Sequence, residues 1–108
     1  MLSEGDAEMT NSEFKNKFEK MVKEIFPYKK FSLSELNKLT VNELMFVLRH
    51  DNEVSDYFLN INSESLGFSF GFLKESYFPT RYLALKIKSL EYEYPDDSEV
   101  PTLLVKTN

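Results

Sequence analysis

The spacing of apolar residues changes near Ser65, and this change constrains the fold more than any other feature of the 108-residue sequence. Before this position, apolar residues recur every three or four residues, as on one face of an amphipathic helix. After it, Phe68, Phe70 and Phe72 alternate with small residues, as on one face of a strand. Helices followed by strands along a chain are typical of an α+β domain, and they disfavour a parallel β–α–β architecture.

Two capping boxes predict where the main helices begin. In each box a threonine is followed three residues later by a glutamate, and each side chain binds the main-chain amide of the other residue. The pairs are Thr10 with Glu13 and Thr40 with Glu43. The first helix is expected to end at Pro27, where proline interrupts the apolar stripe. The second is expected to cover residues 41–50.

Shorter helical segments are expected between and after these two helices. Ser32 and Glu35 repeat the capping-box spacing and predict a short helical turn. Asp51 or Asn52 is expected to cap a further short helix. The apolar residues on one face of that helix are Val54, Tyr57, Phe58 and Ile61.

The second half of the chain predicts strands over residues 65–72, 80–89 and 100–106. The phenylalanines of the first strand are expected to face the helices, because an apolar ladder opposite amphipathic helices usually belongs to the core. These elements predict N-terminal helices packed on one face of a three- or four-stranded antiparallel meander sheet. Residues 1–9 are expected to form a disordered acidic tail, followed by a single domain over residues 10–108.

Composition narrows the classes of protein that this chain can belong to. The sequence contains no cysteine, so disulfides, thiolate nucleophiles and cysteine-bound metals are excluded. No apolar run is long enough to predict a membrane span, and no secretory signal is expected. The expected location is therefore the cytoplasm.

No catalytic or cofactor site is predicted. His50 is the single histidine, and it lies between Arg49 and Asp51. This position near a helix end favours a structural role, because basic side chains there interact well with the helix dipole. No Gly-x-Ser-x-Gly elbow, phosphate-binding glycine loop or calcium-loop spacing occurs. We therefore expect a protein that is not an enzyme and that has no metal ion or other cofactor.

Residues 91–99 concentrate acidic and aromatic side chains and are the leading candidate for a partner-binding site. The carboxylates are Glu91, Glu93, Asp96, Asp97 and Glu99, and the tyrosines are Tyr92 and Tyr94. The apolar phase shifts by one residue at Leu90, which predicts a bulge or a turn near Ser89. The shift places both tyrosines on the apolar side with Leu90 and directs the glutamates outward.

Two interpretations of this cluster remain open. Charged residues and proline at a sheet edge prevent pairing with other chains, so the cluster can be a protective edge. Alternatively, it is a docking surface for a basic protein, with the acids as the main contacts and the tyrosines as weaker anchors. Asp51, Glu53 and Asp56 would extend such a surface if the fold brought them close.

A lysine-rich segment within the acidic chain suggests another function. Residues 15–30 carry six lysines and two glutamates, whereas the whole chain has a net charge of −5. Lysines on one helix can bind phosphates, so a nucleic-acid-binding regulator is an alternative. Most exposed lysine-rich helices are simply solvated, and nucleic acid is the less favoured partner.

The small size, the acidic balance, the lack of cysteine and the α+β pattern together resemble bacterial toxin-immunity proteins. The contact-dependent growth-inhibition type is the nearest class, and the resemblance covers the whole chain without a motif. It implies a non-enzymatic inhibitor that neutralises a cationic toxin, with a nuclease as the leading candidate. The acids and tyrosines of residues 91–99 would then bind the toxin. A phage or plasmid accessory protein that inhibits a host nucleic-acid enzyme is the other alternative.

Overall fold

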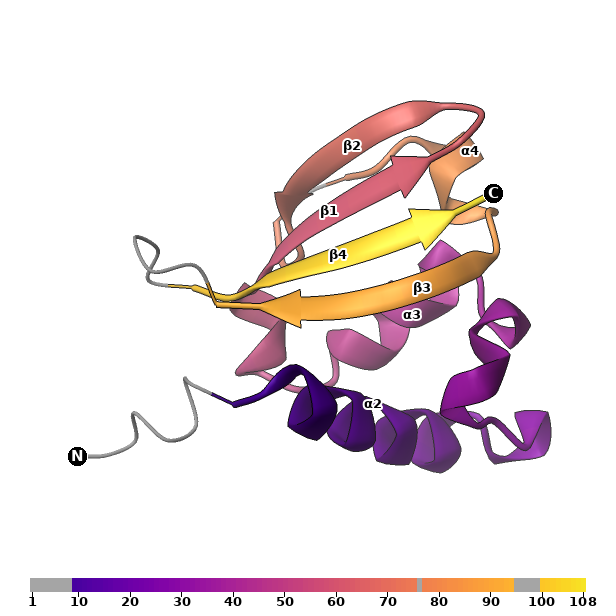
Figure 1. Ribbon diagram of the computed structural model, residues 1–108, viewed down its shortest axis with the longest axis vertical. Coiled ribbons are helices and arrows are strands. Elements are labelled where there is room, and N and C mark those ends of the chain that lie inside the picture. The colour runs from indigo at the N-terminus through magenta and orange to yellow at the C-terminus, as the bar shows by residue number, and fades with distance from the viewer. Residues whose placement is uncertain (1–8, 76, 95–99) are drawn as a thin grey trace.

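The computed structural model describes residues 9–75, 77–94 and 100–108. It has a four-stranded sheet with helices against one face (Figure 1). The helices are α2 (Asn11–Ile25), α3 (Val41–Leu48) and α4 (Thr80–Leu83), and the 3-10 helices are η1 (Pro27–Lys29), η2 (Leu33–Lys38) and η3 (Val54–Asp56). The strands are β1 (Phe58–Ser63), β2 (Gly67–Phe72), β3 (Ile87–Glu93) and β4 (Thr102–Thr107). The predicted α+β class is confirmed.

The sheet is mixed, so the predicted antiparallel meander is wrong in its strand order. The order is β2–β1–β4–β3, and the two central strands, β1 and β4, run parallel. The chain leaves β2, passes through α4 on the helical side, and forms β3 at the far edge before β4 enters the centre (Figure 1). Alternation of side chains predicts that a strand exists, but it does not specify its neighbours.

Both predicted capping boxes are present. The Thr10 hydroxyl accepts a hydrogen bond from the Glu13 amide at 3.0 Å, and the Thr40 hydroxyl accepts one from the Glu43 amide at 3.2 Å. At the third expected start, Ser32 makes no such cap, and its hydroxyl instead contacts the Glu35 carboxylate at 3.2 Å. The helix there is accordingly 3-10 rather than α.

The helix expected after Asp51 ends early, because the chain enters the sheet. Only η3 is helical, and β1 begins at Phe58. Leu59 and Ile61 are fully buried, and the asparagines that alternate with them are half-buried. The alternating pattern of a strand is therefore present in this segment, but the helical spacing of four apolar residues overlaps it.

The expected orientation of the phenylalanine ladder is wrong. Phe68, Phe70 and Phe72 are 67%, 65% and 46% exposed, so they lie on the face of β2 that points away from the helices. The strand contributes no large side chain to the core. The chain after β2 supplies Leu73 and Phe78 instead.

The strand expected over residues 80–89 begins later, since its first residues form α4. The irregularity predicted near Ser89 is confirmed as a register shift between Ile87 and Ser89 in β3. The closing strand is also confirmed, with Leu103 and Val105 buried.

Aromatic packing fixes α2 against the sheet. The Phe14 ring stacks on the Tyr92 ring of β3 with centroids 5.3 Å apart, and on Phe18 with centroids 6.3 Å apart. Met9, the one described residue of the predicted tail, packs against the same core. The helical layer therefore covers one face of the sheet and leaves the other face uncovered by the described residues (Figure 1).

Candidate functional site

We call the uncovered face of the sheet the open face. The chemical character of its side chains changes from one edge of the sheet to the other. The register places them in three rows that run from β2 through β1 and β4 to β3. The rows are Phe72, Phe58, Thr102 and Glu93; Phe70, Asn60, Leu104 and Glu91; and Phe68, Asn62, Lys106 and Ser89. The open face is thus aromatic at the β2 side and acidic at the β3 side.

The aromatic side is a contiguous apolar patch. Phe58 of β1 lies between two phenylalanines of β2, with centroid distances of 5.3 Å to Phe72 and 5.9 Å to Phe70. The exposed fractions of the β2 phenylalanines correspond to roughly 300 to 450 Å² of aromatic surface. This is the usual size of the largest apolar patch on a monomer, and such patches are often functional.

The acidic side contains two of the residues predicted from the sequence. Glu91 and Glu93 both point outward from β3 and are exposed. Lys15 donates a hydrogen bond to Glu91 at 3.0 Å, and Asn11 donates another at 2.6 Å. These contacts lower the pKa of the Glu91 carboxyl below its ordinary value, so Glu91 is ionised and fixed in position.

The tyrosines predicted as weaker anchors do not lie on the open face. Tyr92 is buried and 5% exposed, and burial raises the pKa of its phenol. Tyr94 is half-buried at the end of the described part of this segment. Asp96, Asp97 and Glu99 lie outside the described residues. The structure therefore separates the predicted cluster into outward glutamates and an inward tyrosine.

The helical acids considered as an extension of the site are largely paired within the chain. Asp51 forms an ion pair with Lys17 at 2.8 Å, and Asp56 lies 3.5 Å from Lys74. The residue between them, Glu53, is exposed. Glu91 of the open face is also paired, with Lys15, so pairing alone does not separate the two sets of acids. Their position does, because neither Asp51 nor Asp56 lies on a strand of the sheet.

Within the described part of the chain, acids pair with three of the six lysines in residues 15–30. Lys15 pairs with Glu91 at 3.0 Å, Lys17 with Asp51 at 2.8 Å, and Lys29 with Glu43 at 3.1 Å. Ion pairing reduces the positive potential available to a phosphate backbone. These contacts weigh against nucleic-acid binding by α2.

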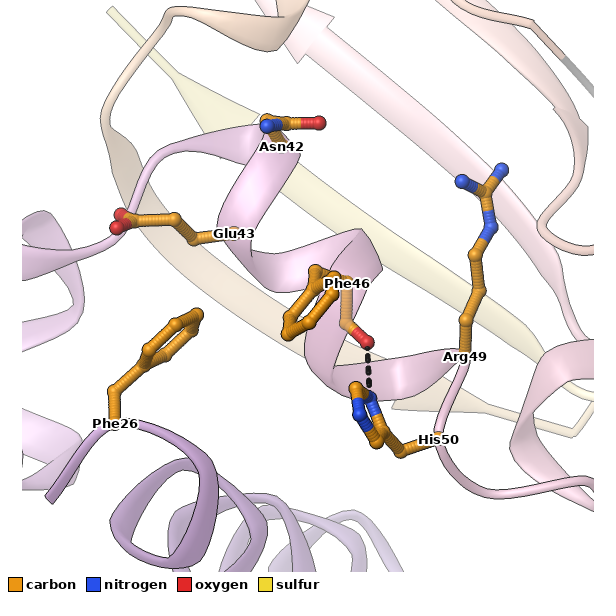
Figure 2. Close-up of a pocket in the computed structure, with 6 residues that line it drawn as sticks. All are labelled: Phe26, Asn42, Glu43, Phe46, Arg49 and His50. Carbon is orange, nitrogen blue, oxygen red and sulfur yellow. Dashed lines mark hydrogen bonds between the residues drawn. The ribbon is translucent and has the colours of Figure 1, made fainter.

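A pocket of about 470 Å³ lies between the end of α2 and α3 (Figure 2). Its apolar walls are the rings of Phe26 and Phe46, whose centroids are 5.9 Å apart. The other lining residues are Asn42, Glu43, Arg49 and His50. An apolar pocket with polar groups at its rim is the usual form of a small-molecule site, so the contacts of these polar groups decide its chemistry.

Three polar residues of the pocket, Glu43, Arg49 and His50, already bind other groups of the protein. The His50 ring bonds the Phe46 carbonyl oxygen through Nδ1 at 2.8 Å (Figure 2). Arg49 donates two hydrogen bonds to the Leu73 carbonyl oxygen at 3.0 and 2.7 Å. Asp51 pairs with Lys17, so the three residues of the Arg49–His50–Asp51 sequence contact three different parts of the molecule. This arrangement is that of a helix end and not of a catalytic triad.

The predicted residues Glu91 and Glu93 lie on the open face, whereas its aromatic half was not predicted from the sequence. A signal for it was present, since the positions that alternate with the phenylalanines are Ser69 and Gly71, which add little to a core. The position of β2 at the edge of the sheet, away from α2, is a property of the strand order, which the sequence pattern does not contain.

Two general features of the described residues complete the description of the site. Within residues 9–75, 77–94 and 100–108, no group of three or more acidic or histidine side chains is placed to hold a metal ion. The described helices include none with the length and apolarity needed to cross a membrane.

Comparisons of the chain with protein-family models, with curated proteins and with solved structures found no match.

Proposed function

We propose that this protein is a non-enzymatic inhibitor that binds another protein through the open face. The observation that carries the proposal is that exposed phenylalanines and outward glutamates share one uncovered sheet face. The partner that fits has an apolar patch and, at some distance from it, basic side chains, because Glu91 and Glu93 lie on the same face as the aromatic patch but beyond β4.

The physical properties of this face suit protein recognition. Aromatic side chains at interface centres supply large contact areas, and they often account for most of the binding energy. The phenylalanines lie on paired strands, and the Phe58 ring contacts the rings of Phe70 and Phe72, so these side chains lose little freedom on binding. The glutamates would favour basic partners and accelerate encounter, and raised salt should slow association.

The resemblance to toxin-immunity proteins implies what this binding would do in the cell. In that case the partner is a cationic toxin domain, and binding covers its active surface in the cytoplasm. A phage or plasmid inhibitor of a host nucleic-acid enzyme would use the same surface and the same physics. The two cases differ in the identity of the partner, and an immunity gene should lie beside a toxin gene.

The experiment compares immobilised wild-type protein with two variants as bait for proteins from the organism that carries the gene. Phe70→Ser removes an aromatic side chain from the open face, whereas Tyr28→Ser removes one from the helical side, where Tyr28 is 73% exposed. A partner that uses the open face should be retained by wild type and Tyr28→Ser and lost with Phe70→Ser. We expect the purified partner to bind Phe70→Ser at least tenfold more weakly than wild type.

Charge and inhibition are tested separately with the same partner. Glu93→Lys should weaken binding, and the loss should shrink as salt is raised. For the immunity function, expression of the partner should arrest growth, and co-expression of wild type should restore it. Equal affinity of wild type, Phe70→Ser and Glu93→Lys would refute the proposed surface.

A further inference from the structure

The two edges of the sheet differ in how they are closed. At β3, the Ile87 amide donates to the Leu39 carbonyl oxygen at 3.0 Å, and the Tyr92 amide donates to the Asn11 side chain at 2.9 Å. The β2 edge has the character of an unprotected strand. Residues 67–72 contain no charged residue and no proline, the devices that usually prevent edge pairing.

The direction of the main-chain groups of β2 follows from its pairing with β1. The Leu73 amide donates to the Tyr57 carbonyl oxygen at 2.9 Å, and hydrogen-bonded pairs alternate along an antiparallel ladder. Phe68, Phe70 and Phe72 therefore direct their amides and carbonyls to the outer edge.

Two of the outer carbonyl groups have partners near the strand ends. The Tyr82 hydroxyl donates to the Phe68 carbonyl at 3.4 Å, and the Glu75 amide donates to the Phe72 carbonyl at 3.2 Å. Among the described residues, none bonds the outer amide or carbonyl of Phe70. The middle of the edge is thus open to another strand.

The sequence of β2 is self-complementary. Residues 68–72 read Phe-Ser-Phe-Gly-Phe, which is symmetric about Phe70 in the placing of large and small side chains. An antiparallel copy centred on Phe70 would place every phenylalanine opposite a phenylalanine and every small residue opposite a small residue. The outer groups of Phe70 in each copy would then bond those of Phe70 in the other.

We infer that two copies of the chain pair through their β2 edges, antiparallel and centred on Phe70, into one continuous sheet. The open faces of both copies then lie on the same side, and their phenylalanines form a single aromatic band. The pairing is related by a two-fold axis, so it uses the β2 edges of both copies. Further copies cannot add at the outer edges, because β3 is blocked by α2 and by the segment before α3. A second copy is the favoured occupant because it offers the same uncharged, matched strand.

The exposed area sets the strength of this pairing. The aromatic patches of two copies together amount to roughly 600 to 900 Å², and pairing along the strand edges buries only part of this area, which is less than a stable interface buries. The dimer should therefore be weak, with a dissociation constant on the order of 10 to 100 µM. Pairing would raise the local density of open faces and so favour partners that are themselves dimeric.

The absence of cysteine makes the register directly testable. The test uses Phe70→Cys, Phe68→Cys, Phe72→Cys and Tyr28→Cys, each oxidised under identical mild conditions. Position 70 faces itself across the axis, at a spacing of about 5.5 Å between Cα atoms that a disulfide can bridge. Positions 68 and 72 face each other, whereas two copies of position 68 lie about 14 Å apart.

The expected result is that Phe70→Cys forms disulfide-linked dimers at least tenfold faster than Tyr28→Cys, which is similarly exposed. A mixture of Phe68→Cys and Phe72→Cys should give mixed dimers faster than either variant gives its own. Cross-linking of Phe70→Cys at the rate of Tyr28→Cys would overturn the inference, and so would faster self-linking of Phe68→Cys than of the mixture.

A second measurement tests the pairing without cysteine. Sedimentation velocity of wild type should show a rising mean mass over the range of about 10 to 500 µM. Phe70→Lys should remain monomeric with an unchanged circular dichroism spectrum, because position 70 lies outside the core. Wild type that stays monomeric throughout this range would overturn the inference. Neither result depends on the hetero-partner proposed above, since no partner is present.

Discussion

Asn11 of α2 binds the main chain of Tyr92 at the edge of the sheet. Its Oδ1 accepts a hydrogen bond from the Tyr92 amide at 2.9 Å, and its Nδ2 donates to the Glu91 carboxylate at 2.6 Å. One side chain thus closes the β3 edge and orients an outward glutamate of the open face. At the β2 edge, no described residue bonds the outer amide or carbonyl of Phe70, so the middle of this edge can bind another strand and the β3 edge cannot.

Replacement of Asn11 by alanine should lower the free energy of unfolding by about 1 to 2 kcal/mol, because the Tyr92 amide loses its acceptor in a partly buried position. Urea denaturation measures this loss. Asn16→Ala is the matched control, since Asn16 is an exposed residue of the same helix. We expect this control to change stability by less than about 0.5 kcal/mol. Equal effects of the two variants would contradict the role given to Asn11.

Truncation of Phe14 should destabilise the fold much more than truncation of Phe70. Phe14→Ala removes a fully buried ring that stacks on Tyr92 and should cost about 3 to 5 kcal/mol. Phe70→Ser removes a ring that is 65% exposed and should cost less than about 1 kcal/mol. Thermal or urea unfolding distinguishes these values. A large loss with Phe70→Ser would mean that the ladder packs in the core after all.

The sequence predicted α2 and α3 well because local interactions determine where these helices begin. The capping boxes at Thr10 and Thr40 involve residues three apart, and the apolar stripe of α2 is set by its own spacing. These features appear in the structure at the expected residues. Burial then follows for Phe14 and Phe18, which lie on the stripe.

The structure of the second half of the chain depends on the order of the strands, which the alternation of side chains does not specify. Phe68, Phe70 and Phe72 were assigned to the correct strand, but which face of that strand is buried depends on its place in the sheet. Leu59 and Ile61 alternate with asparagines and belong to a strand, although their apolar neighbours also fit a helical period. In both cases, contacts between distant parts of the chain decide between two structures that the local spacing of apolar residues allows.

Only part of the candidate site was predicted from the sequence, because the rest depends on strand order. The phase shift at Leu90 is local, so it correctly indicated that Glu91 and Glu93 point outward and that Tyr92 points inward. The aromatic half of the open face depends on strand order, since β1 brings Phe58 beside Phe70 and Phe72. No spacing in the sequence contains that relationship.

Stability in acid should depend on Asp51. Burial by itself raises the pKa of this carboxyl, but the ion pair with Lys17 and the amides of Glu53 and Val54 outweigh it, so the net pKa is lowered. A carboxyl with a lowered pKa in the folded state contributes stability above its unfolded pKa of about 3.9, and this contribution is lost as the pH falls below that value.

Asp51→Asn should therefore be less stable than wild type by about 1 kcal/mol at pH 7, and the difference should shrink as the pH falls below about 3.9. Urea midpoints at several pH values give the comparison. Lys17→Met should reduce the same dependence, because Lys17 is the ion-pair partner at 2.8 Å. A constant difference between wild type and Asp51→Asn from pH 7 to pH 2.5 would refute this linkage.

Stability in alkali should depend on the buried tyrosines. Burial, together with the nearby Tyr92 phenol, raises the pKa of Tyr57, and burial also raises the pKa of Tyr92. A phenol with a raised pKa in the folded state ionises first in the unfolded chain. The stability it contributes is complete below the ordinary pKa of about 10 and is lost as the pH rises above it, at about 1.4 kcal/mol per pH unit for each such group.

Tyr57→Phe keeps the buried ring and removes the phenol that titrates. Its stability at pH 7 should stay within about 1 kcal/mol of wild type, and it should be the more stable protein at pH 11 because it lacks this loss. Urea unfolding at pH 7, 9, 10 and 11 measures the crossing of the two curves. Tyr28→Phe, at a ring that is 73% exposed, is the control and should follow wild type. If Tyr57→Phe and wild type lost stability in parallel above pH 10, ionisation of Tyr57 would not be coupled to unfolding.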